Sequence, residues 1–345
     1  MTDHTIILDH YEGREAAALM DRGRLADLLI DGGDAPRLGT IYRAVAQRPV
    51  KGQGGMFLTT PDGTAFLRQI KGLAPGQTLL VQVTGHAEPG KAIPVTAKIL
   101  FKSRYAIVTP EAPGLNISRS IRDDDRRDAL LELAHAGMEG SAMGLILRSA
   151  AEEAEAEEIA EDIAAMRNLA EEITADTEGA AEVLLEGDGP HGLAWRDWAM
   201  PADVITEPGG FAREEVLDQL EALRQDAVPL SGGASMWIEP TRALVAVDVN
   251  TGGDTSPAAG HKANLAAARE LPRQLRLRGL GGQVVLDLAP MPKKDRRGFE
   301  STLRAAFRAD QVETALVGWT PLGHYELQRK RDRIALAALL EGAAG

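Results

Sequence analysis

Short apolar runs separated by turn residues dominate the first third of the chain. Residues 1–34 carry three such runs and end at a Gly-Gly-Asp turn, a pattern that predicts a β-meander. Residues 36–104 carry five more, with turns such as Pro61-Asp-Gly63 between them. Five short strands of this kind predict a small barrel of the OB-fold type, a fold that often binds single-stranded nucleic acid.

Strands and helices mix from residue 105 onwards. A strand at 105–108 and a helix at 126–136 come first, and a strand at 144–149 follows them. The pattern then predicts two acidic helices, at 151–174 and 178–185.

The last part of the chain alternates strands with helices. After an irregular stretch with one helix at 213–224, the pattern over residues 231–345 predicts an α/β unit. Its predicted elements are, in order, a hairpin (236–240 and 243–249), a helix (262–278), a strand (283–288), a helix (295–309), a strand (312–317) and a helix (323–341). A functional site is expected in the loops at the strand ends of such a unit.

The composition limits the class of protein. A chain of 345 residues is long enough for two to four compact units. No apolar run approaches the length of a membrane span and no signal peptide is apparent, so we expect no membrane partner. Cysteine is absent, which excludes disulfides, a thiolate zinc site and a cysteine nucleophile and fits a cytoplasmic protein.

The charge is distributed unevenly. A formal net charge of −13 argues against nucleic acid as a partner when it is taken alone. Residues 151–190, however, hold fourteen acids and one base, whereas residues 261–308 hold eleven Lys or Arg and four acids. Because a polyanion meets the local field, the basic segment keeps nucleic acid among the expected partners.

Two apolar runs in the predicted α/β unit end in carboxylates. The first ends in Asp248 and Asn250, and the second ends in Asp287. Side chains two residues apart on a strand share a face, so Asp248 and Asn250 can converge, and Asp287 joins them if the two strands are neighbours. Oxygen ligands of this kind suit Mg²⁺. The alternative is an ordinary Asn-Thr-Gly-Gly turn after a strand that happens to end in an acid.

Basic residues gather on two segments near these acids. Arg269, Arg273 and Arg276 lie four and three residues apart on the predicted helix 262–278, so they form one cationic stripe. A cationic loop follows Asp287 and consists of Lys293, Lys294, Arg296 and Arg297. The alternative for both segments is a solvated surface. About six phosphate contacts to a single strand would give a log–log salt slope of roughly −4.

Several motifs in residues 231–332 together resemble the catalytic core of the ribonuclease E/G endoribonucleases. The most specific is the run RQLRLRGLGG at residues 273–282. The other matching motifs are Ser231-Gly-Gly, AVDVNTG at 246–252, NLAAARELP at 264–272, VVLD at 284–287 and QRKR at 328–331. The resemblance extends more weakly over almost the whole chain.

The resemblance implies an α+β fold of several subdomains, with an OB-fold β-barrel inserted in an RNase H-like part. The expected parts are a first RNase H-like segment (1–35), an OB-fold RNA-binding barrel (36–104), a 5′-sensor-like region (105–190), a reduced second RNase H-like segment (191–230) and a DNase I-like α/β catalytic subdomain (231–345). The family's larger members carry two cysteines, a shared zinc and a further small domain. This cysteine-free chain resembles a short form without them, so no zinc is expected, and any oligomer is not zinc-linked.

The same resemblance assigns roles residue by residue. Asp248 and Asp287 match the magnesium-binding carboxylates, and Asn250 matches the partner that positions the scissile phosphate. Arg148 and Ser149 match the pocket for a 5′-monophosphate; the alternative for Arg148 is a structural ion pair with the acidic helices nearby.

The predicted barrel offers its own candidates for contact with RNA, namely Phe57, Phe66 and Lys91. The two phenylalanines also fall where the family's RNA-contacting aromatics lie. The alternative is that both rings belong to the barrel core.

Some positions depart from the family pattern. Pro272 falls inside a predicted helix, which should kink there and re-aim Arg276. Asn116 replaces a glycine of the sensor-like loop, and Leu-Ala-Pro follows Asp287 where family members carry a further acid.

The expected function is that of a Mg²⁺-dependent endoribonuclease that cleaves single-stranded RNA in RNA processing, including rRNA processing, or decay, with 5′-monophosphate sensing. A metal ion held by Asp248 and Asp287 would lower the pKa of a bound water, so no protein nucleophile is needed. The alternative is a divergent relative that binds RNA with little or no cleavage, and a weaker one is a structural paralogue without RNA.

Overall fold

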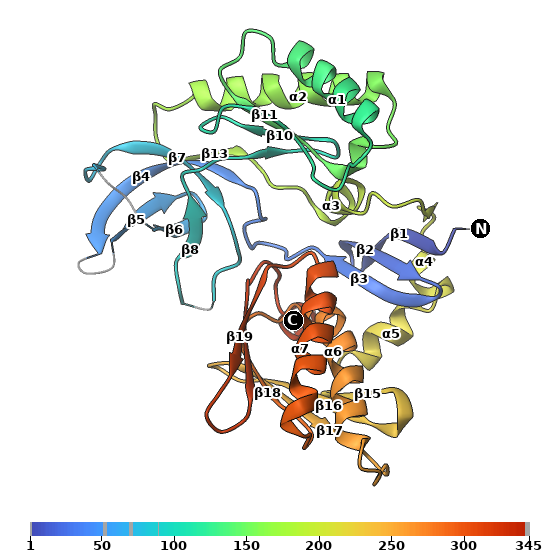
Figure 1. The fold of residues 1–345 in the computed structure, drawn as a ribbon. Coiled ribbons are helices and arrows are strands. Elements are labelled where there is room, and N and C mark those ends of the chain that lie inside the picture. Colours follow the sequence, from blue (N-terminus) through green and yellow to red (C-terminus); the bar gives the residue numbers. More distant parts are fainter. Residues whose placement is uncertain (1, 51–53, 69–71, 89, 342–345) are drawn as a thin grey trace. The chain divides into compact units, whose positions relative to one another are not determined.

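The chain divides into two compact units. The computed structural model describes residues 2–50, 54–68, 72–88 and 90–341. Unit 1 comprises Met1–His4 and Asp31–Asp203, and unit 2 comprises Thr5–Ile30 and Val204–Gly345. The main part of unit 1 is therefore an insertion within the sequence of unit 2 (Figure 1). Within the described ranges, no helix is both long enough and apolar enough to span a membrane.

The N-terminal strands of unit 2 confirm the predicted meander. They form a sheet of order β14-β1-β2-β3. Its strands are β1 (His4–Tyr11), β2 (Arg14–Asp21), β3 (Arg24–Ile30) and β14 (Asp203–Ile205). The helix expected at 213–224 is broken at Glu215, which has a φ of 56°, into α4 (Gly210–Arg213) and α5 (Val216–Ala222). Phe211 and Leu220 of these helices share a core with Ile7, so two distant segments of the chain fold together.

Unit 1 begins with a closed five-stranded barrel, which confirms the predicted OB-like fold. The strand order is β4-β5-β6-β8-β7, and β7 closes the barrel by pairing with β4. The strands are β4 (Ile41–Val50), β5 (Gly55–Thr60), β6 (Gly63–Leu67), β7 (Thr78–Val83) and β8 (Ile93–Thr96). Leu58, Ala65 and Val81 lie fully buried inside it.

The prediction of a second acidic helix at 178–185 is wrong. Residues Glu182–Leu185 form strand β13, which pairs antiparallel with β4. The buried guanidinium of Arg43 on β4 forms ion pairs with Glu182 at 2.8 Å and Asp176 at 3.2 Å. A short acidic segment thereby gains both backbone partners and a counter-charge at the barrel edge, which an isolated two-turn helix lacks.

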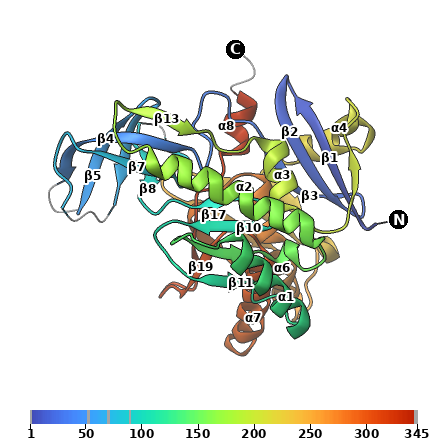
Figure 2. The same ribbon diagram turned by 90° about the horizontal axis from the view of Figure 1, so that it is seen from above.

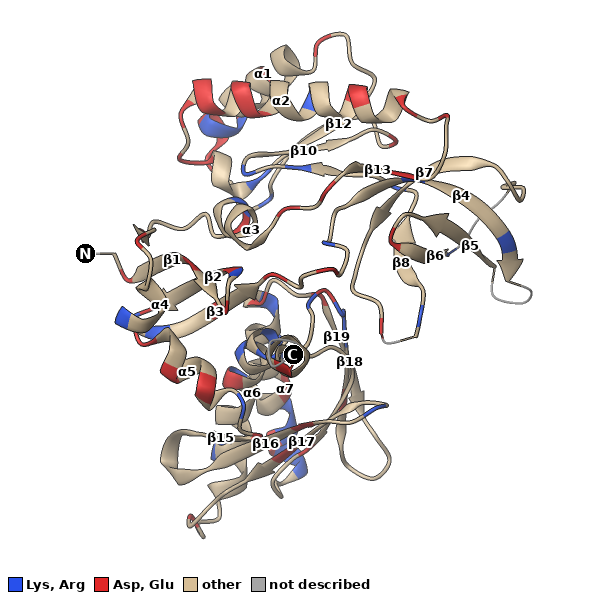
Figure 3. Ribbon diagram, turned by 180° about the vertical axis from the view of Figure 1, so that it is seen from behind, with Lys and Arg blue, Asp and Glu red and all other residues tan. Residues whose placement is uncertain are grey.

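The remainder of unit 1 is a sheet covered by two helices (Figure 2). The sheet has the order β11-β12-β10-β9 and consists of β9 (Phe101–Lys102), β10 (Ala106–Thr109), β11 (Leu115–Ile117) and β12 (Gly144–Leu147). The helices are α1 (Asp124–Gly137) and α2 (Ala156–Ala175), and a shorter α3 (Pro190–Asp197) follows β13. Helix α2 buries Ile159 and Ile163, while acids occupy its exposed positions (Figure 3).

Unit 2 ends in a six-stranded sheet of order β15-β16-β17-β18-β20-β19. Its strands are β15 (Ala227–Pro229), β16 (Ser235–Pro240), β17 (Val245–Asn250), β18 (Gly282–Asp287), β19 (Thr314–Trp319) and β20 (Tyr325–Arg329). Helices α6 (Ala259–Leu277) and α7 (Arg296–Ala309) contribute Leu271, Leu275 and Phe299 to one core with this sheet. The predicted α/β alternation is confirmed, and α6 continues through the buried Pro272.

The C-terminal helix predicted at 323–341 is wrong over its first part. Residues Tyr325–Arg329 form β20, which lies between β18 and β19, and only α8 (Leu336–Glu341) is helical. Tyr325, Leu327 and Arg329 are buried and alternate with more exposed residues, as a strand with one covered face requires.

A buried ion network fastens α6 and β20 in place. Asp310 forms ion pairs with Arg276 and, at 2.6 Å, with Arg329. Asp27 of β3 pairs with Arg333 at 2.5 Å. Burial by itself raises the pKa of Asp27, but the contacts with Arg333 and Arg276 outweigh burial and hold that pKa below its usual range. Removing one partner of such a network would leave an uncompensated buried charge.

Candidate active site

Asp248 and Asp287 are neighbours on the six-stranded sheet. Strands β17 and β18 run parallel, and their register places Asp248 directly beside Asp287. Each acid lies at or near the C-terminal end of its strand, and both side chains are exposed. The sequence predicted that Asp287 would lie beside Asp248 if their two strands were neighbours. The strands are neighbours, so this prediction is confirmed.

Asn250 shares the face of Asp248 and contacts it. Its side-chain nitrogen donates a hydrogen bond of 2.7 Å to Oδ2 of Asp248. The bond uses the amide nitrogen, so the amide oxygen can act as a further ligand or acceptor. Asp248, Asn250 and Asp287 thus gather three oxygen-bearing side chains at one edge of the sheet.

We call the line of exposed side chains formed by Asp248, Asn250 and Asp287 the row. Two further side chains extend it, and neither was predicted from the sequence. Trp237 of β16 is the register partner of Asp248, so the two side chains stand on the same face. On the other side, Nδ1 of His324 lies 3.3 Å from Oδ1 of Asp287. The predicted hairpin of 236–240 with 243–249 contained a signal for Trp237. His324 carried none, because its segment was predicted to be helical.

The opposite face of the sheet explains why the row is open. Met236, Val247 and Leu286 alternate with the row residues and are buried against α6 and α7. Because side chains on a strand alternate between faces, burial of these apolar residues directs Trp237, Asp248 and Asp287 away from the core.

The loop after Asp287 is fixed by a buried amide. The side chain of Asn264 on α6 donates to the carbonyl oxygen of Ala289 at 2.8 Å and accepts from its backbone nitrogen at 3.0 Å. Gly260 lies so close to this loop that a Cβ atom there would be 2.0 Å from the carbonyl oxygen of Pro290. Helix α6 therefore holds the end of β18, and with it Asp287, in a defined position.

The donor set fits a hard divalent cation. Two carboxylates and an amide are oxygen ligands, and Mg²⁺ commonly binds through one or two protein carboxylates while it keeps several waters. Among the residues described, no group of three or more His, Cys, Asp or Glu gathers to hold a metal ion. Asp254, in the loop after β17, lies 3.5 Å from Lys262, and a backbone hydrogen bond from Ser256 is the main cause that lowers its pKa.

The predicted cationic stripe on α6 is divided between surface and interior. Arg269 is exposed. Arg273 donates to the carbonyl oxygen of Leu25 at 2.7 Å and pairs with Glu270 at 2.6 Å. Arg276 donates to the carbonyl oxygen of Ala26 in addition to its contact with Asp310. The last two arginines join α6 to β3, so Arg269 is the member of the stripe best placed to meet a polyanion.

The cationic loop after β18 remains largely accessible. Lys293, Lys294 and Arg297 are exposed. Arg296 is half-buried, with its guanidinium carbon 4.1 Å from the ring centroid of Trp319. This stacking fixes Arg296 in place, whereas the other three side chains can reach a ligand.

Phe57 and Phe66 lie outside the barrel core. They are register partners on β5 and β6, and their ring centroids are 5.5 Å apart. Both are half-buried, while Met56, Leu58 and Ala65 face the interior. The alternative that both rings are core residues is therefore excluded.

The two phenylalanines line a groove on the barrel with Lys91 and His86. Lys91 is exposed and pairs with Glu88 at 2.8 Å. Burial lowers the pKa of His86 to about 4, so this histidine is neutral near pH 7. The groove thus combines two aromatic rings with a modest positive charge.

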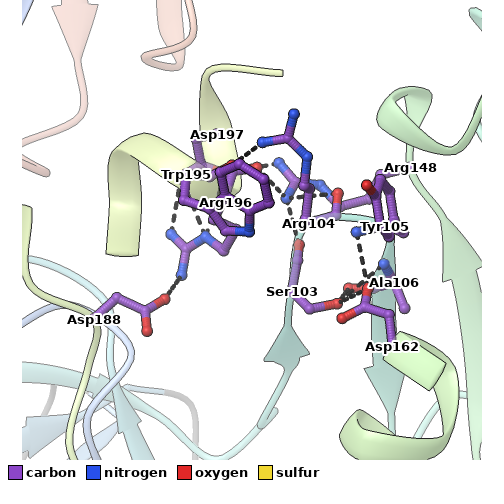
Figure 4. A network of polar contacts seen from close by, with 10 residues as sticks. All are labelled: Ser103, Arg104, Tyr105, Ala106, Arg148, Asp162, Asp188, Trp195, Arg196 and Asp197. Atoms are coloured by element: carbon purple, nitrogen blue, oxygen red, sulfur yellow. Dashed lines mark hydrogen bonds and ion pairs between the residues drawn. The ribbon is translucent and has the colours of Figure 1, made fainter. Parts of the chain in front are cut away.

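Arg148 is engaged by the protein itself (Figure 4). Its guanidinium donates to the carbonyl oxygens of Ser103 at 2.5 Å and Arg196 at 3.0 Å, and to a carboxylate oxygen of Asp197 at 2.7 Å. Burial raises the pKa of Asp197, but hydrogen bonds from Arg196 and Arg148 outweigh burial and leave it lowered. The neighbouring Ser149 is exposed.

Comparison with known proteins places this architecture in a family. A barrel of OB strand order and an α/β sheet that presents two adjacent carboxylates define a modular protein of mixed α/β class. The model of the Ribonuclease E/G family matches residues 101–201 and 203–332. The chain belongs to this family.

Individual relatives share about a quarter to a third of their aligned residues with the chain. A protein named Ribonuclease E from Nostoc sp. is 27% identical over 380 residues, covering 93% of this chain and 55% of its own length. Ribonuclease G of Salmonella typhimurium is 27% identical over 325 residues, covering 82% and 64%. Ribonuclease E of Escherichia coli is 30% identical over 301 residues, covering 75% and 28%. The chain therefore spans less than two thirds of these relatives.

Proposed function

We propose that the chain is a Mg²⁺-dependent endoribonuclease that cleaves single-stranded RNA. The observation that carries this proposal is the register of β17 and β18, which brings Asp248 beside Asp287 on an exposed face. Membership of the Ribonuclease E/G family and the names of the relatives support the choice of RNA as substrate.

We assign a separate role to each side chain of the row. Asp248 and Asp287 would hold the ion, and Asn250, oriented by its hydrogen bond to Asp248, would position the scissile phosphate through its amide. When bound, Mg²⁺ would neutralise charge that develops on the phosphate and lower the pKa of a coordinated water. The contact from His324 would hold the Asp287 carboxylate in one orientation.

Exposed cations and rings supply the contacts with the polymer. In unit 2, Arg269 and Lys293 are accessible for phosphate contacts, while Arg273 and Arg276 hold α6 to β3. In unit 1, the Phe57–Phe66 pair offers aromatic surface beside Lys91, an arrangement that suits unpaired bases and a backbone phosphate.

Sensing of a 5′-monophosphate is the finer part of the proposal. A phosphate would have to compete with Asp197 for the guanidinium of Arg148, whereas the Ser149 hydroxyl is exposed. A phosphate can replace a carboxylate on an arginine because both accept charge-assisted hydrogen bonds. The sensor would therefore work by exchange of one anion for another.

Cleavage of a single-stranded 5′-monophosphorylated oligonucleotide tests the main proposal. We expect cleavage with Mg²⁺, none with EDTA, and loss of cleavage in Asp287→Asn. Glu313→Gln is the matched control and should cleave like the wild type, because Glu313 is an exposed acid of unit 2 away from Asp248 and Asp287. Cleavage that persists in Asp287→Asn would contradict the proposal.

A second candidate function is RNA binding with little or no cleavage. Two observations favour it: Asp287 already has a partner in His324, and the described residues gather no third acid at the row. Binding of the oligonucleotide by the wild-type chain, without cleavage at any Mg²⁺ concentration, would select this alternative.

A further inference from the structure

We propose that Trp237 stacks on an unpaired nucleobase of the nucleotide adjoining the phosphate that Asp248 and Asp287 address. The inference rests on the proposed function and adds a contact that selects the substrate. It concerns unit 2 alone, where a single sheet carries all the residues involved.

The sheet places the indole directly beside the carboxylate pair. Trp237 on β16 is opposite Asp248 on β17, which is opposite Asp287 on β18. Directly opposite residues in an antiparallel pair have Cβ atoms about 5 Å apart and point to the same side. A phosphate held at the two acids thus lies within one nucleotide of the Trp237 ring.

Trp237 is not a core residue of this sheet. Its neighbours Met236 and Ile238 are fully buried, whereas 45% of Trp237 is exposed. Side chains alternate between the two faces of the strand. Met236 and Ile238 therefore face the core, and the indole of Trp237 faces outward. Its exposure follows from the register and not from a local irregularity.

The other three tryptophans have partners that Trp237 lacks. Trp198 is buried, and Trp319 packs against Phe299 and Tyr325. Trp195 is 63% exposed, but the guanidinium of Arg104 lies 4.1 Å from its ring centroid. Within the part of the chain that the structure describes, neither an aromatic ring nor a cation stacks on Trp237.

The charges around Trp237 select a base and not a phosphate as its occupant. Asp248 lies across from it, and Glu239 follows two residues later on the same strand face. These acids repel phosphate in the absence of a cation, whereas a nucleobase is uncharged and presents a flat π-face. Stacking of this kind tolerates any base but requires one that is not stacked in a duplex.

The consequence is a preference at one nucleotide position. An unpaired base next to the cleaved bond would bind better than an abasic or duplexed nucleotide there. Because larger bases stack more strongly, a purine at that position would be favoured over a pyrimidine.

Abasic scanning of a short 5′-monophosphorylated RNA tests the proposal. Equilibrium binding is measured in Mg²⁺ by anisotropy of a 3′ label on RNA with cleavage-resistant linkages, with one abasic nucleotide placed at each position in turn. For the wild-type chain we expect one position where removal of the base weakens binding roughly 5- to 150-fold. The Trp237→Ala variant should lose this sensitivity at that position.

Further variants guard against loss of fold and against an unspecific effect. Trp237→Leu keeps apolar bulk without a π-face and should behave like Trp237→Ala, whereas Trp237→Phe should retain part of the sensitivity. Trp195→Ala removes the exposed indole of unit 1 and should keep the wild-type profile. Thermal unfolding of each variant shows whether the fold persists.

The outcomes separate this inference from the proposed function. An identical abasic profile in the wild type and in Trp237→Leu would overturn the stacking proposal even if RNA is cleaved. A dimer that dissociates in Trp237→Leu, together with an unchanged profile, would overturn it in favour of a contact between two copies. A Trp237-dependent profile without cleavage would support stacking and overturn the nuclease. Absence of any binding would overturn both.

Discussion

The two charged features that the sequence singles out, the Asp248–Asp287 pair in unit 2 and Arg148 in unit 1, have opposite surroundings. The side chain of Asp287 is 68% exposed, and its one protein contact among those described is His324. The side chain of Arg148 is 21% exposed, and it donates hydrogen bonds to Asp197 and to three backbone carbonyl oxygens. Only the first group can accept a ligand without first losing contacts within the protein.

The difference shows that a match to a family motif does not by itself tell whether a residue is free to bind a ligand. A ligand competes with water for Asp248 and Asp287, whereas it competes with an anion and oriented carbonyl groups for Arg148. Breaking such contacts in a partly buried site costs free energy that the ligand must offset. We therefore expect the carboxylate pair to govern activity and Arg148 to govern stability at least as much as sensing.

The largest effect is expected at the carboxylate pair. Asp287→Asn should reduce Mg²⁺-dependent cleavage by at least about 100-fold, because a metal ion contributes several kcal/mol to the transition state. Thermal stability should be unchanged, because the side chain is exposed and its substitution leaves no buried charge. Cleavage assays and thermal unfolding of the same preparations check both statements. A strongly destabilised Asp287→Asn would break the comparison.

Arg148→Ala should show the reverse pattern. Loss of its hydrogen bonds would remove a donor from the carbonyl oxygens of Ser103 and Arg196, while Asp197 would keep its ion pair with Arg196. We expect unit 1 to be destabilised by about 2 kcal/mol. Urea unfolding measures this effect. Arg119→Ala is the matched control, because Arg119 is exposed in the loop after β11 and its removal should change stability by less than about 0.5 kcal/mol.

The sensor hypothesis adds a second readout at the same place. If a 5′-monophosphate replaces Asp197, then Asp197→Asn should raise the preference for 5′-monophosphorylated over 5′-hydroxyl RNA, and Arg148→Ala should abolish it. Binding of the two oligonucleotides to each variant separates the roles. An unchanged preference in both variants would leave Arg148 with a structural role alone.

His86 is an intermediate case, since it lines the barrel groove and yet is uncharged near neutral pH. Its pKa is about 4 in the folded chain, whereas an unperturbed histidine has a pKa of 6.5. The unfolded chain therefore binds a proton more readily below pH 6.5, and stability falls as the pH drops from 6.5 towards 4. The loss between about pH 7 and pH 5 should be about 2 kcal/mol.

Hydrogen–deuterium exchange of barrel peptides can measure this loss of stability. His86→Gln cannot bind the proton and should show a flatter dependence of exchange protection on pH over the same range. The same acid dependence in both proteins would show that other groups cause it.

The smallest effect concerns two arginines of one helix. Arg269→Ala should weaken RNA binding a few-fold and make the log–log salt slope less steep by about 0.7, as the loss of one phosphate contact requires. Arg276→Ala should leave the slope unchanged and lower stability, because its guanidinium holds Asp310 and β3. Salt titrations of binding distinguish the two, and equal slopes for all three proteins would remove Arg269 from the RNA contacts.

Elements with a clear period and a covered face were predictable from the sequence. The barrel strands, the N-terminal meander and the alternation of β17, α6 and β18 follow from local apolar patterns. The two segments predicted as helices that form strands, β13 and β20, are short and have strand partners that lie far away in the sequence. Pairing with β4, β18 and β19 decided their conformation, and local propensity carries no information on such partners.

The candidate site divides in the same way. Asp248, Asn250 and Asp287 were found because period two and the strand ends fix their positions locally. Trp237 was missed although the predicted hairpin contained a signal for it, because the register of β16 and β17 decides which residue lies opposite Asp248. His324 was missed because its segment was predicted to be helical. The sequence showed that Arg273 and Arg276 of the most specific motif share a helix face. It did not show that they contact β3 and not a ligand, because spacing carries no information on what covers that face.

By itself, the sequence determined most of the elements, the membership in a family by its motifs, and the acids that we propose as cation ligands. The tertiary structure alone decided which charged side chains remain accessible to a ligand. It also decided which ones, such as Arg273, Arg276 and Arg148, form contacts that hold α6, β3 and α3. The physical reason is that availability depends on neighbours brought together by long-range pairing and burial, whereas residue type and periodicity are properties of the chain alone.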